Sequence, residues 1–296
     1  MSLAPAVHCL FRHGVLLALW LAFIGMPVLA YDLHKAVPAR LLYGASKFFI
    51  SAETEVVQQV TTAAQARSEL QPPGMGTAVE AGEDGVFRVS LTSEILGIRS
   101  QFHAWLNSDA RILQRTSLYT GRKNWYRNYR FTEDGAYSIK RWPVNDEESS
   151  KFWSAWSSTA EDHYVIGEAS RHLPLSEAEA IFYLVNVADL QRPGDTVVQP
   201  LFDKTGAIKV TLSVQDRVPV DVDFRQFTTS GEERVRGTID SLHVLIVYRP
   251  FAPDSTTDDF KFLGYKGDVD FYIDPVRRIM VKASGRIDYL GQIDIL

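Results

Sequence analysis

Apolar and polar side chains alternate with a period of two through roughly the last hundred residues of this chain. From Val218 to Phe224, valines and a phenylalanine take every second position, and Asp221 and Asp223 lie between them. The stretch 267–273 repeats this alternation. Because successive side chains of a strand point to opposite faces, each segment gains one apolar and one polar face. This rhythm is typical of an antiparallel sheet with one face in water.

Strand-like segments separated by turn residues also fill the earlier part of the chain. Glu133-Asp134-Gly135, for example, separates two such segments and predicts a hairpin. The predicted strand regions are 47–60, 85–92, 95–106, 111–119, 123–132, 136–142, 196–201, 207–214, 218–227, 234–248, 260–273, 279–283 and 286–295. The predicted fold is therefore mainly β, a curved antiparallel sheet or an open half-barrel.

One segment has the features of a longer helix. The run Ser176-Glu177-Ala178-Glu179 has the pattern of a capping box, in which the serine accepts hydrogen bonds from the first free amides and the last glutamate reaches back. Apolar residues follow as far as Val187, and Arg192-Pro193-Gly194-Asp195 predicts the end of the helix. We expect one main α-helix at about residues 176–191, packed against the sheet.

The first thirty residues have the pattern of a secretory signal peptide. Arg12 and His13 precede an apolar run of about ten residues, which is shorter than the roughly twenty that a membrane-spanning helix needs. Val28 and Ala30 occupy the −3 and −1 positions of a small-residue cleavage site. We predict a cleavable signal peptide at 1–30, with cleavage after Ala30. A single β-rich periplasmic domain at 31–296 then follows, and its residues 31–45 form a lead-in.

Composition narrows the location and the partners. The only cysteine, Cys9, lies in the predicted signal peptide, so the exported chain has none for disulfides. An exported chain without disulfides is common in a bacterial periplasm, which is the location we predict. The formal net charge of −5 argues against a nucleic-acid partner, because such proteins usually carry a basic footprint. No segment after the signal approaches the length of a membrane span, so we predict no transmembrane segment after cleavage.

A family resemblance follows from the second half of the chain. The helix pattern opens at Leu175-Ser176 and closes on Arg192-Pro193-Gly194-Asp195, strand pairs follow, and the chain ends with Phe271-Tyr272-Ile273-Asp274-Pro275-Val276-Arg277-Arg278-Ile279-Met280-Val281 and then Gly291. Over roughly residues 40–296 this resembles the secreted bacterial β-rich proteins of domain-of-unknown-function family 3108. The family usually has a proline after the Asp/Arg turn, where this chain has Ile279-Met280. The resemblance implies an envelope location and a curved antiparallel sheet, as in periplasmic lipoprotein carriers, and it implies no catalytic residues.

Enzyme signatures are mostly missing from the sequence. It contains no His-Glu-x-x-His, Gly-x-Ser-x-Gly, phosphate-loop or dinucleotide pattern. His163 and His172 lie near acidic residues but lack the tight spacing of metal ligands. We therefore predict no catalytic residues, no metal site and no cofactor. The carboxylate pairs Asp221/Asp223 and Asp268/Asp270 leave open an alternative, an envelope glycan or peptide hydrolase.

Aromatic residues supply the candidate binding surface. The stretch 122–131 interleaves cations with rings, as an anionic-glycan or lipid-headgroup surface would, although a hairpin with mixed faces has the same pattern. A second aromatic group, at Phe152, Trp153 and Trp156, fits either a sugar or acyl-chain platform or a small core. The candidate ligand-binding residues are Trp105, Trp125, Tyr129, Trp153, Trp156, Phe182 and Tyr183.

These observations favour a binding protein. An apolar concave sheet offers a long groove, and concave apolar surfaces are where ligands usually bind. We predict a non-enzymatic periplasmic binding or assembly protein for a hydrophobic or amphipathic envelope component, with a lipid, a glycan or an envelope protein as partner. A second alternative is a structural interaction protein without a ligand, in which the helix fills the sheet. A missing cavity and a large exposed apolar patch would favour that alternative.

Overall fold

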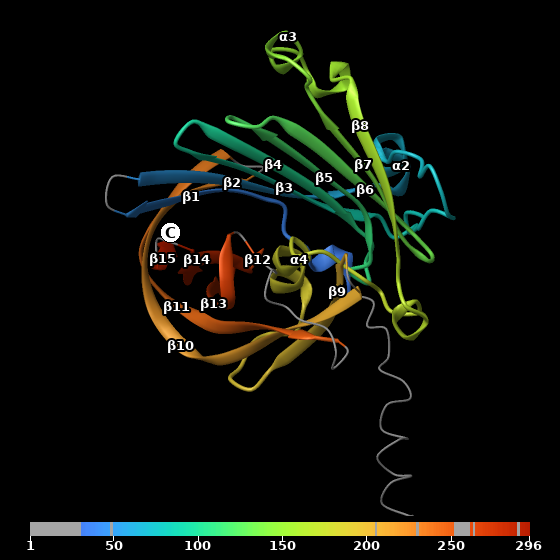
Figure 1. Ribbon diagram of the computed structural model, residues 1–296. Helices are drawn as coiled ribbons and strands as arrows, with labels where there is room; N and C mark the ends of the chain where they lie inside the picture. The colour runs from blue at the N-terminus through green and yellow to red at the C-terminus, as the bar shows by residue number, and fades with distance from the viewer. Residues whose placement is uncertain are drawn as a thin grey trace, which may run out of the picture. The chain divides into compact units, whose positions relative to one another are not determined.

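Antiparallel strands make up most of the computed structural model (Figure 1). It describes residues 31–47, 50–204, 206–228, 231–251, 261–262, 264–288 and 291–296, which belong to one unit, Tyr31–Leu296. The predicted signal peptide and its cleavage site lie outside the described residues. Among the described residues, no helix is both long and apolar enough to cross a membrane.

The N-terminal half forms an eight-stranded sheet, sheet A, in which each strand pairs with the next one along the chain. The predicted hairpin at Glu133-Asp134-Gly135 is confirmed, because Thr132 of one strand pairs with Gly135 of the next. The strands of sheet A are β1 (Ala39–Lys47), β2 (Ile50–Thr61), β3 (Val86–Ile95), β4 (Ile98–Leu106), β5 (Ile112–Thr120), β6 (Trp125–Thr132), β7 (Gly135–Trp142) and β8 (Ser158–Val165).

The C-terminal part forms sheet B, in the order β15-β14-β13-β11-β10-β9, with the short β12 paired to β13. Its strands are β9 (Thr196–Asp203), β10 (Gly206–Thr228), β11 (Gly231–Pro250), β12 (Lys261–Phe262), β13 (Tyr265–Asp274), β14 (Ile279–Ile287) and β15 (Gly291–Ile295). The predicted alternation is confirmed, because Val220 and Val222 are buried whereas Asp221 and Asp223 are exposed.

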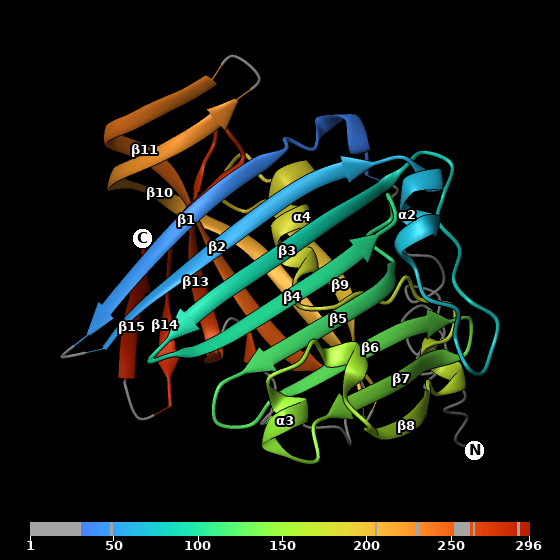
Figure 2. The same cartoon turned by 90° about the horizontal axis from the view of Figure 1, so that it is seen from above.

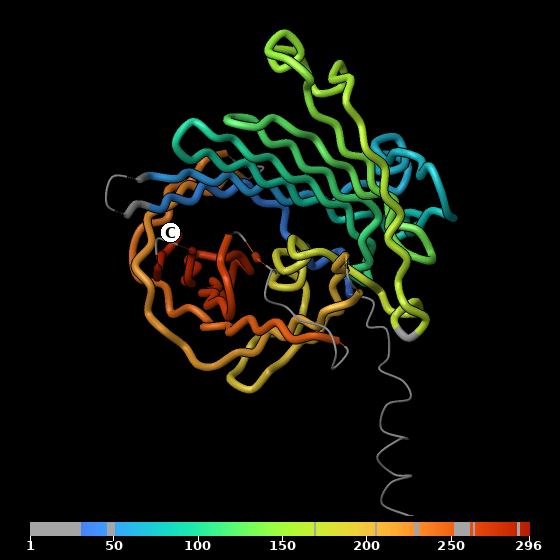
Figure 3. Tube along the Cα trace, in the orientation of Figure 1, coloured from blue at the N-terminus to red at the C-terminus, as the bar shows by residue number. Residues whose placement is uncertain are grey.

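The strands β10 and β11 form a ribbon that is much longer than its neighbours. The sequence predicts two strands, 207–214 and 218–227, where the structure has one. The pairing shifts by one residue between Val214 and Asp216, which is the signature of a β-bulge. Because a bulge bends a strand and increases its twist, the ribbon curves toward β1, as the trace in Figure 3 shows.

The described helical segments are short: η1 (Leu33–Lys35), α2 (Ala63–Glu69), α3 (Asp146–Ser149), η2 (Trp153–Ala155), η3 (Glu168–Ser170) and α4 (Ala180–Val187). Every residue of α4 is buried, which fits a helix that is apolar on nearly all sides. It contacts β3 of sheet A and β14 of sheet B, and so lies between the two sheets (Figure 2).

The predicted start and cap of this helix are wrong. Ser176 is extended, because its backbone pairs with the strand around Leu201. Glu179 makes no capping hydrogen bond, because its carboxylate accepts hydrogen bonds from Arg115 instead. The helix therefore covers only Ala180–Val187 rather than 176–191.

The predicted lead-in at 31–45 is also corrected. Strand β1 already begins at Ala39, and Leu33 and Ala36 before it are buried in the core. The predicted mainly β fold of curved antiparallel sheet is confirmed, with its strands divided between two sheets. Gly44 N–H donates to Leu296 O (2.8 Å) and Leu296 N–H donates to Gly44 O (3.1 Å), which joins β1 to the end of sheet B. No strand pairing among the described residues joins β8 to β9, so the two sheets form an open half-barrel.

Candidate functional site

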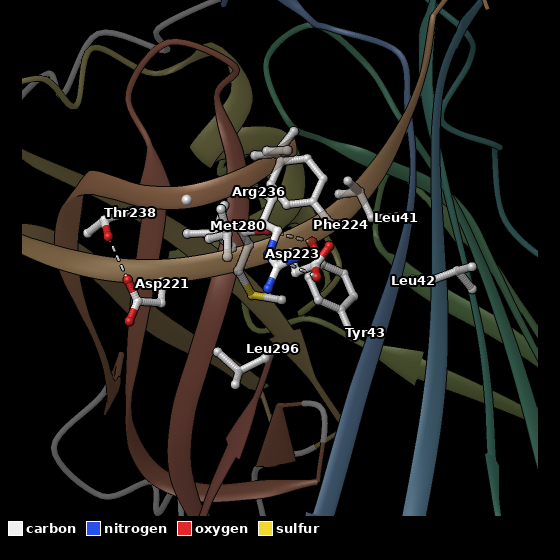
Figure 4. A pocket seen from close by; sticks show the side chains of 14 residues that line it. Leu41, Leu42, Tyr43, Asp221, Asp223, Phe224, Arg236, Thr238, Met280 and Leu296 are labelled. Carbon is white, nitrogen blue, oxygen red and sulfur yellow. Dashed lines mark hydrogen bonds and ion pairs between the residues drawn. The ribbon is translucent and has the colours of Figure 1, made fainter. Parts of the chain in front are cut away.

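A groove of about 550 Å³ lies where β1 approaches the β10–β11 ribbon and β14 (Figure 4). We call it the apolar groove, and its main apolar lining residues are Leu41, Tyr43, Val222, Phe224, Met280 and Leu296. Leu42 and Leu296 at its edge are 49% and 56% exposed. Three strands that are distant in sequence therefore leave apolar surface uncovered at this place, and such surface is typical of ligand sites.

A glycine keeps the groove open on the ribbon side. Gly237 of β11 pairs with Val222 of β10, so the two share the face that borders the groove. A Cβ atom at Gly237 would meet no heavy atom within 4 Å. The backbone of this glycine has φ +143°, which other residues rarely adopt, so the position favours glycine and leaves space opposite Val222.

The floor of the groove is held by one buried hydrogen bond. The Tyr43 hydroxyl of β1 donates to the backbone carbonyl of Met280 of β14 (2.7 Å). Burial raises the pKa of Tyr43 well above its ordinary value, so this donor stays protonated. Tyr43 and Met280 also line a second cavity of about 90 Å³, whose other walls include Phe182 of α4. These two side chains therefore stand between the groove and a smaller space near the core.

The rim of the groove is polar. The Arg234 guanidinium donates to both Asp223 carboxylate oxygens (2.7 and 2.6 Å), and Arg236 Nε lies 3.8 Å from Asp223 Oδ2. Asp221 accepts a hydrogen bond from the Thr238 hydroxyl (2.6 Å). An apolar interior with a polar, solvent-exposed rim suits an amphipathic molecule better than a wholly polar one.

The carboxylates of this rim do not have the chemistry of a glycosidase. Hydrolysis of that kind needs a carboxylic acid with a raised pKa as proton donor. The hydrogen bonds from Arg234 instead lower the pKa of Asp223. The other predicted pair lies elsewhere: Asp268 is 3.5 Å from Arg249, and Asp270 Oδ1 is 2.8 Å from His243 Nε2. This second pair is therefore engaged by basic side chains of its own sheet.

His163, one of the two histidines near acidic residues in the sequence, and His243 of β11 have separate carboxylate neighbours. His163 Nε2 lies 3.8 Å from Asp134, while His243 lies between Asp216 and Asp270 and stacks on Tyr272. Within the ranges that the structure describes, no group of three histidine, cysteine or acidic side chains is close enough to hold a metal ion.

Five of the seven predicted ligand-binding residues are packed away from the apolar groove, and one of these borders only the small cavity. On sheet A, Trp105 is buried and its Nε1 donates to Glu69 (2.9 Å). Trp153 stacks on Tyr126 at 3.7 Å between ring centroids, and Trp156 is buried. In α4, Phe182 and Tyr183 are core residues, of which Phe182 borders the cavity of about 90 Å³.

The other two predicted residues, Trp125 and Tyr129, lie on the opposite face of β6 from Tyr126. Tyr129 packs against Phe202 of β9, so this face of sheet A looks toward sheet B. Trp125 stacks on Tyr119, with 5.8 Å between the ring centroids. The structure therefore does not bring the seven residues together in one site.

The groove residues themselves were missed by the sequence analysis. Leu41, Val222 and Met280 come from three separate regions, and nothing in their local pattern distinguishes them from core residues. One usable signal was present: Gly237 lies within a predicted strand, where a glycine often marks a bulge or a close approach of a ligand.

Comparisons with known proteins identify no family for this chain. No family model matches it, and no curated protein matches it. A similar solved structure is the crystal structure of a β-barrel-like protein of domain of unknown function DUF1849 from Brucella abortus, with 11% sequence identity and a TM-score of 0.41. The match covers 88% of this chain and 95% of that chain.

Proposed function

We propose that this protein binds a hydrophobic or amphipathic envelope component in the bacterial periplasm, with one acyl chain in the apolar groove. The observation that carries the proposal is the open groove of about 550 Å³ with its apolar interior. Its volume falls within the range of roughly 300–1,000 Å³ that is common for small-molecule sites. The polar rim at Asp221, Asp223 and Arg236 would keep the head of the ligand in water.

The signal-peptide pattern at 1–30 supports the periplasmic location, and the motifs of the second half support membership in family 3108. Both are proposals from the sequence. The open groove counts against the alternative of a purely structural protein, which predicts no cavity, although α4 is buried between the two sheets as that alternative expects. The lowered pKa of Asp223 counts against the hydrolase alternative.

The direct test is a titration of the mature chain with a fluorescent fatty acid, 11-(dansylamino)undecanoic acid. We expect a saturable, blue-shifted emission, because the dansyl-bearing chain leaves water for an apolar site. Val222→Phe places extra volume inside the groove, and we expect it to weaken binding by about tenfold or more, which is about 1.4 kcal/mol.

The matched control is Val198→Phe, the same substitution at a half-exposed position of β9 that does not border the groove. It should leave the affinity unchanged. Thermal unfolding of both variants checks that they fold. Equal affinities of the two folded variants, or no saturable emission with the unmodified chain, would contradict the proposal.

A further inference from the structure

Three cations meet on the inner face of sheet A, at the end far from the apolar groove. Arg127 of β6 and Lys140 of β7 are direct register partners, so their side chains leave the sheet side by side on one face. Lys204 follows the last residue of β9. We call Arg127, Lys140 and Lys204 the cation cluster. The inner face is the one that carries Tyr129. The Tyr129 hydroxyl accepts a hydrogen bond from Arg127, and its ring packs on Phe202 of β9.

These cations lack ion-pair partners. In the parts of the chain that the structure describes, no carboxylate lies within 4.0 Å of any of the three side-chain charges. Asp162, Asp203 and Glu177 are near enough to act on Lys204 through space, without direct contact. Like charges directly opposite each other on neighbouring strands are destabilising. The arrangement therefore costs folding free energy unless an anion from outside compensates it.

Arg115 of β5, next to the cluster, is paired with carboxylates, as buried charges in proteins usually are. Its guanidinium donates to both Glu179 carboxylate oxygens (2.9–3.2 Å), and Glu177 lies 3.9 Å away. Arg115 and Tyr129 are register partners, and Arg127 of the cluster lies two residues before Tyr129 in β6. The fold thus pairs Arg115 directly with a carboxylate, whereas the neighbouring cations have no direct carboxylate contact among the described residues.

Aromatic side chains hold the cations in place without neutralising them. Lys140 Nζ lies 6.0 Å from the ring centre of Trp125 and 5.6 Å from that of Trp142. Lys204 Nζ lies 5.9 Å from the Tyr164 ring. Cation–π contacts of this kind restrain a cation while its charge stays available to a ligand.

The Arg127 guanidinium has both a fixed position and an unused donor. One of its terminal nitrogens donates to the Tyr129 hydroxyl (2.9 Å). Its Nε is buried and has no hydrogen-bond partner among the described residues. A buried N–H without a partner is uncommon in folded proteins, and this one is a donor available to a bound anion.

Burial and repulsion between like charges both lower the pKa values of the two lysines in the cluster. Burial lowers the pKa of Lys140, and the nearby charges of Arg127, Lys204 and Lys123 lower it further. The pKa of Lys204 is lowered by burial and by Arg127. A bound anion would reverse the electrostatic part of both shifts.

We propose that the cation cluster is a binding site for a phosphate or phosphate-monoester group. Such a group carries about two negative charges at neutral pH, and its oxygens match the planar donors of a guanidinium as well as two ammonium groups. This site is independent of the apolar groove: four strands lie between β1 and β6, which at about 4.8 Å per strand step separates them by roughly 24 Å.

Calorimetric titration of the mature chain with inorganic phosphate, against sodium chloride at matched ionic strength, tests the site. We expect saturable binding of phosphate above the chloride background. Lys140→Gln and Lys204→Gln should each weaken it by about fivefold or more. Lys209→Gln, a matched change of an exposed lysine on β10, should have no effect.

A second arm identifies the source of the phosphate group. Phosphatidylcholine vesicles with and without phosphatidic acid are sedimented with the protein. Binding to phosphatidic-acid vesicles that Lys140→Gln abolishes would assign a lipid headgroup, whereas binding of free phosphate alone would assign a soluble phosphate compound. Failure of both arms, or equal loss with Lys209→Gln, would overturn the proposal. Neither result depends on the fatty-acid titration, so the two proposals fail separately.

Discussion

At the β1 end of sheet A, apolar side chains from β1, β10 and β14 border open space, whereas at the β6–β7 end Arg127, Lys140 and Lys204 lie together without an ion pair to any described carboxylate. The first end has too little protein to cover its apolar surface. At the second end, none of the three cations is in direct contact with a described carboxylate. Both departures concern side chains that are held in fixed positions, by the Tyr43–Met280 hydrogen bond at one end and by cation–π contacts at the other.

Our two proposals assign ligands of opposite character to the two ends. An acyl chain would replace water at the first end, and an oxyanion would replace missing counter-charge at the second. Between the ends, α4 and its neighbours form a continuous buried core. The core therefore separates the two surfaces, and substitutions at one end should leave the other unchanged.

The largest effect should come from Arg115→Met, because the change leaves the buried Glu179 carboxylate without its cation. Removing one partner of a buried ion pair typically costs about 3–5 kcal/mol. We expect the free energy of unfolding in urea to fall by about 3 kcal/mol or more. Arg217→Met breaks the exposed pair with Asp240 (3.0 Å) and should cost less than about 1 kcal/mol. Equal losses of unfolding free energy in the two variants would show that the buried Arg115 pair stabilises the fold no more than an exposed ion pair does.

Next, Met280→Ala should join the apolar groove to the smaller cavity behind it. Truncation of a buried methionine typically costs about 2–5 kcal/mol, so a lower midpoint of urea unfolding is expected. The same change should shift binding preference toward longer fatty acids, measured by displacement of the dansyl probe with acids of increasing length. If the folded variant kept the same preference for fatty-acid length, this would contradict the placement of the ligand's acyl chain beside Met280.

The raised pKa of Glu177 should make the free energy of unfolding depend on pH. Burial, with a smaller contribution from Glu179, raises the pKa of Glu177 to about 8, although Arg115 opposes the shift. Between about pH 4.5 and pH 8 the folded chain therefore binds more protons at this site than the unfolded chain, so the free energy of unfolding falls as the pH rises. One such proton gives a slope of up to about 1.4 kcal/mol per pH unit.

Glu177→Gln should remove most of that slope, so the variant gains stability over the unmodified chain at pH 7.5 and not at pH 4.5. Urea unfolding across this window measures it. Glu147→Gln, at an exposed carboxylate in α3, should leave the slope as it is. A slope that survives Glu177→Gln would place the titrating group elsewhere.

The smallest effect should come from Lys140→Glu. It replaces a like-charged cross-strand pair with an opposite-charged one, which we expect to stabilise the chain by about 0.5 kcal/mol in chloride buffer. The same variant should no longer bind phosphate. A less stable variant would mean that Lys140 already has a compensating partner in the free protein.

The alternation of side chains made most of the fold predictable. The period of two in 218–224 and the turn at 133–135 each correspond to a real strand or hairpin. The helix bounds could not be predicted, because the buried cation of Arg115, which is distant in sequence, binds Glu179 and prevents the predicted cap. The place where the two sheets meet could not be predicted either, because it depends on hydrogen bonds between β1 and Leu296, which lie near opposite ends of the described chain.

The site was less predictable, for a reason that also comes from alternation. Trp125 and Tyr126 are neighbours in sequence, yet one faces the interior of the half-barrel and the other stacks on Trp153 outside it. A list of aromatic residues therefore mixes two faces. The groove depends on positions where side-chain volume is missing, such as Gly237. The composition of the chain does not reveal such positions.

Native mass spectrometry of the protein isolated from its own envelope fraction tests the central claim most directly. We expect the mature chain to retain an adduct with the mass of a single-chain amphiphile, and Val222→Phe to lose that adduct while Val198→Phe keeps it. A bare mass for the unmodified chain, or an adduct that Val222→Phe retains in full, would contradict the account.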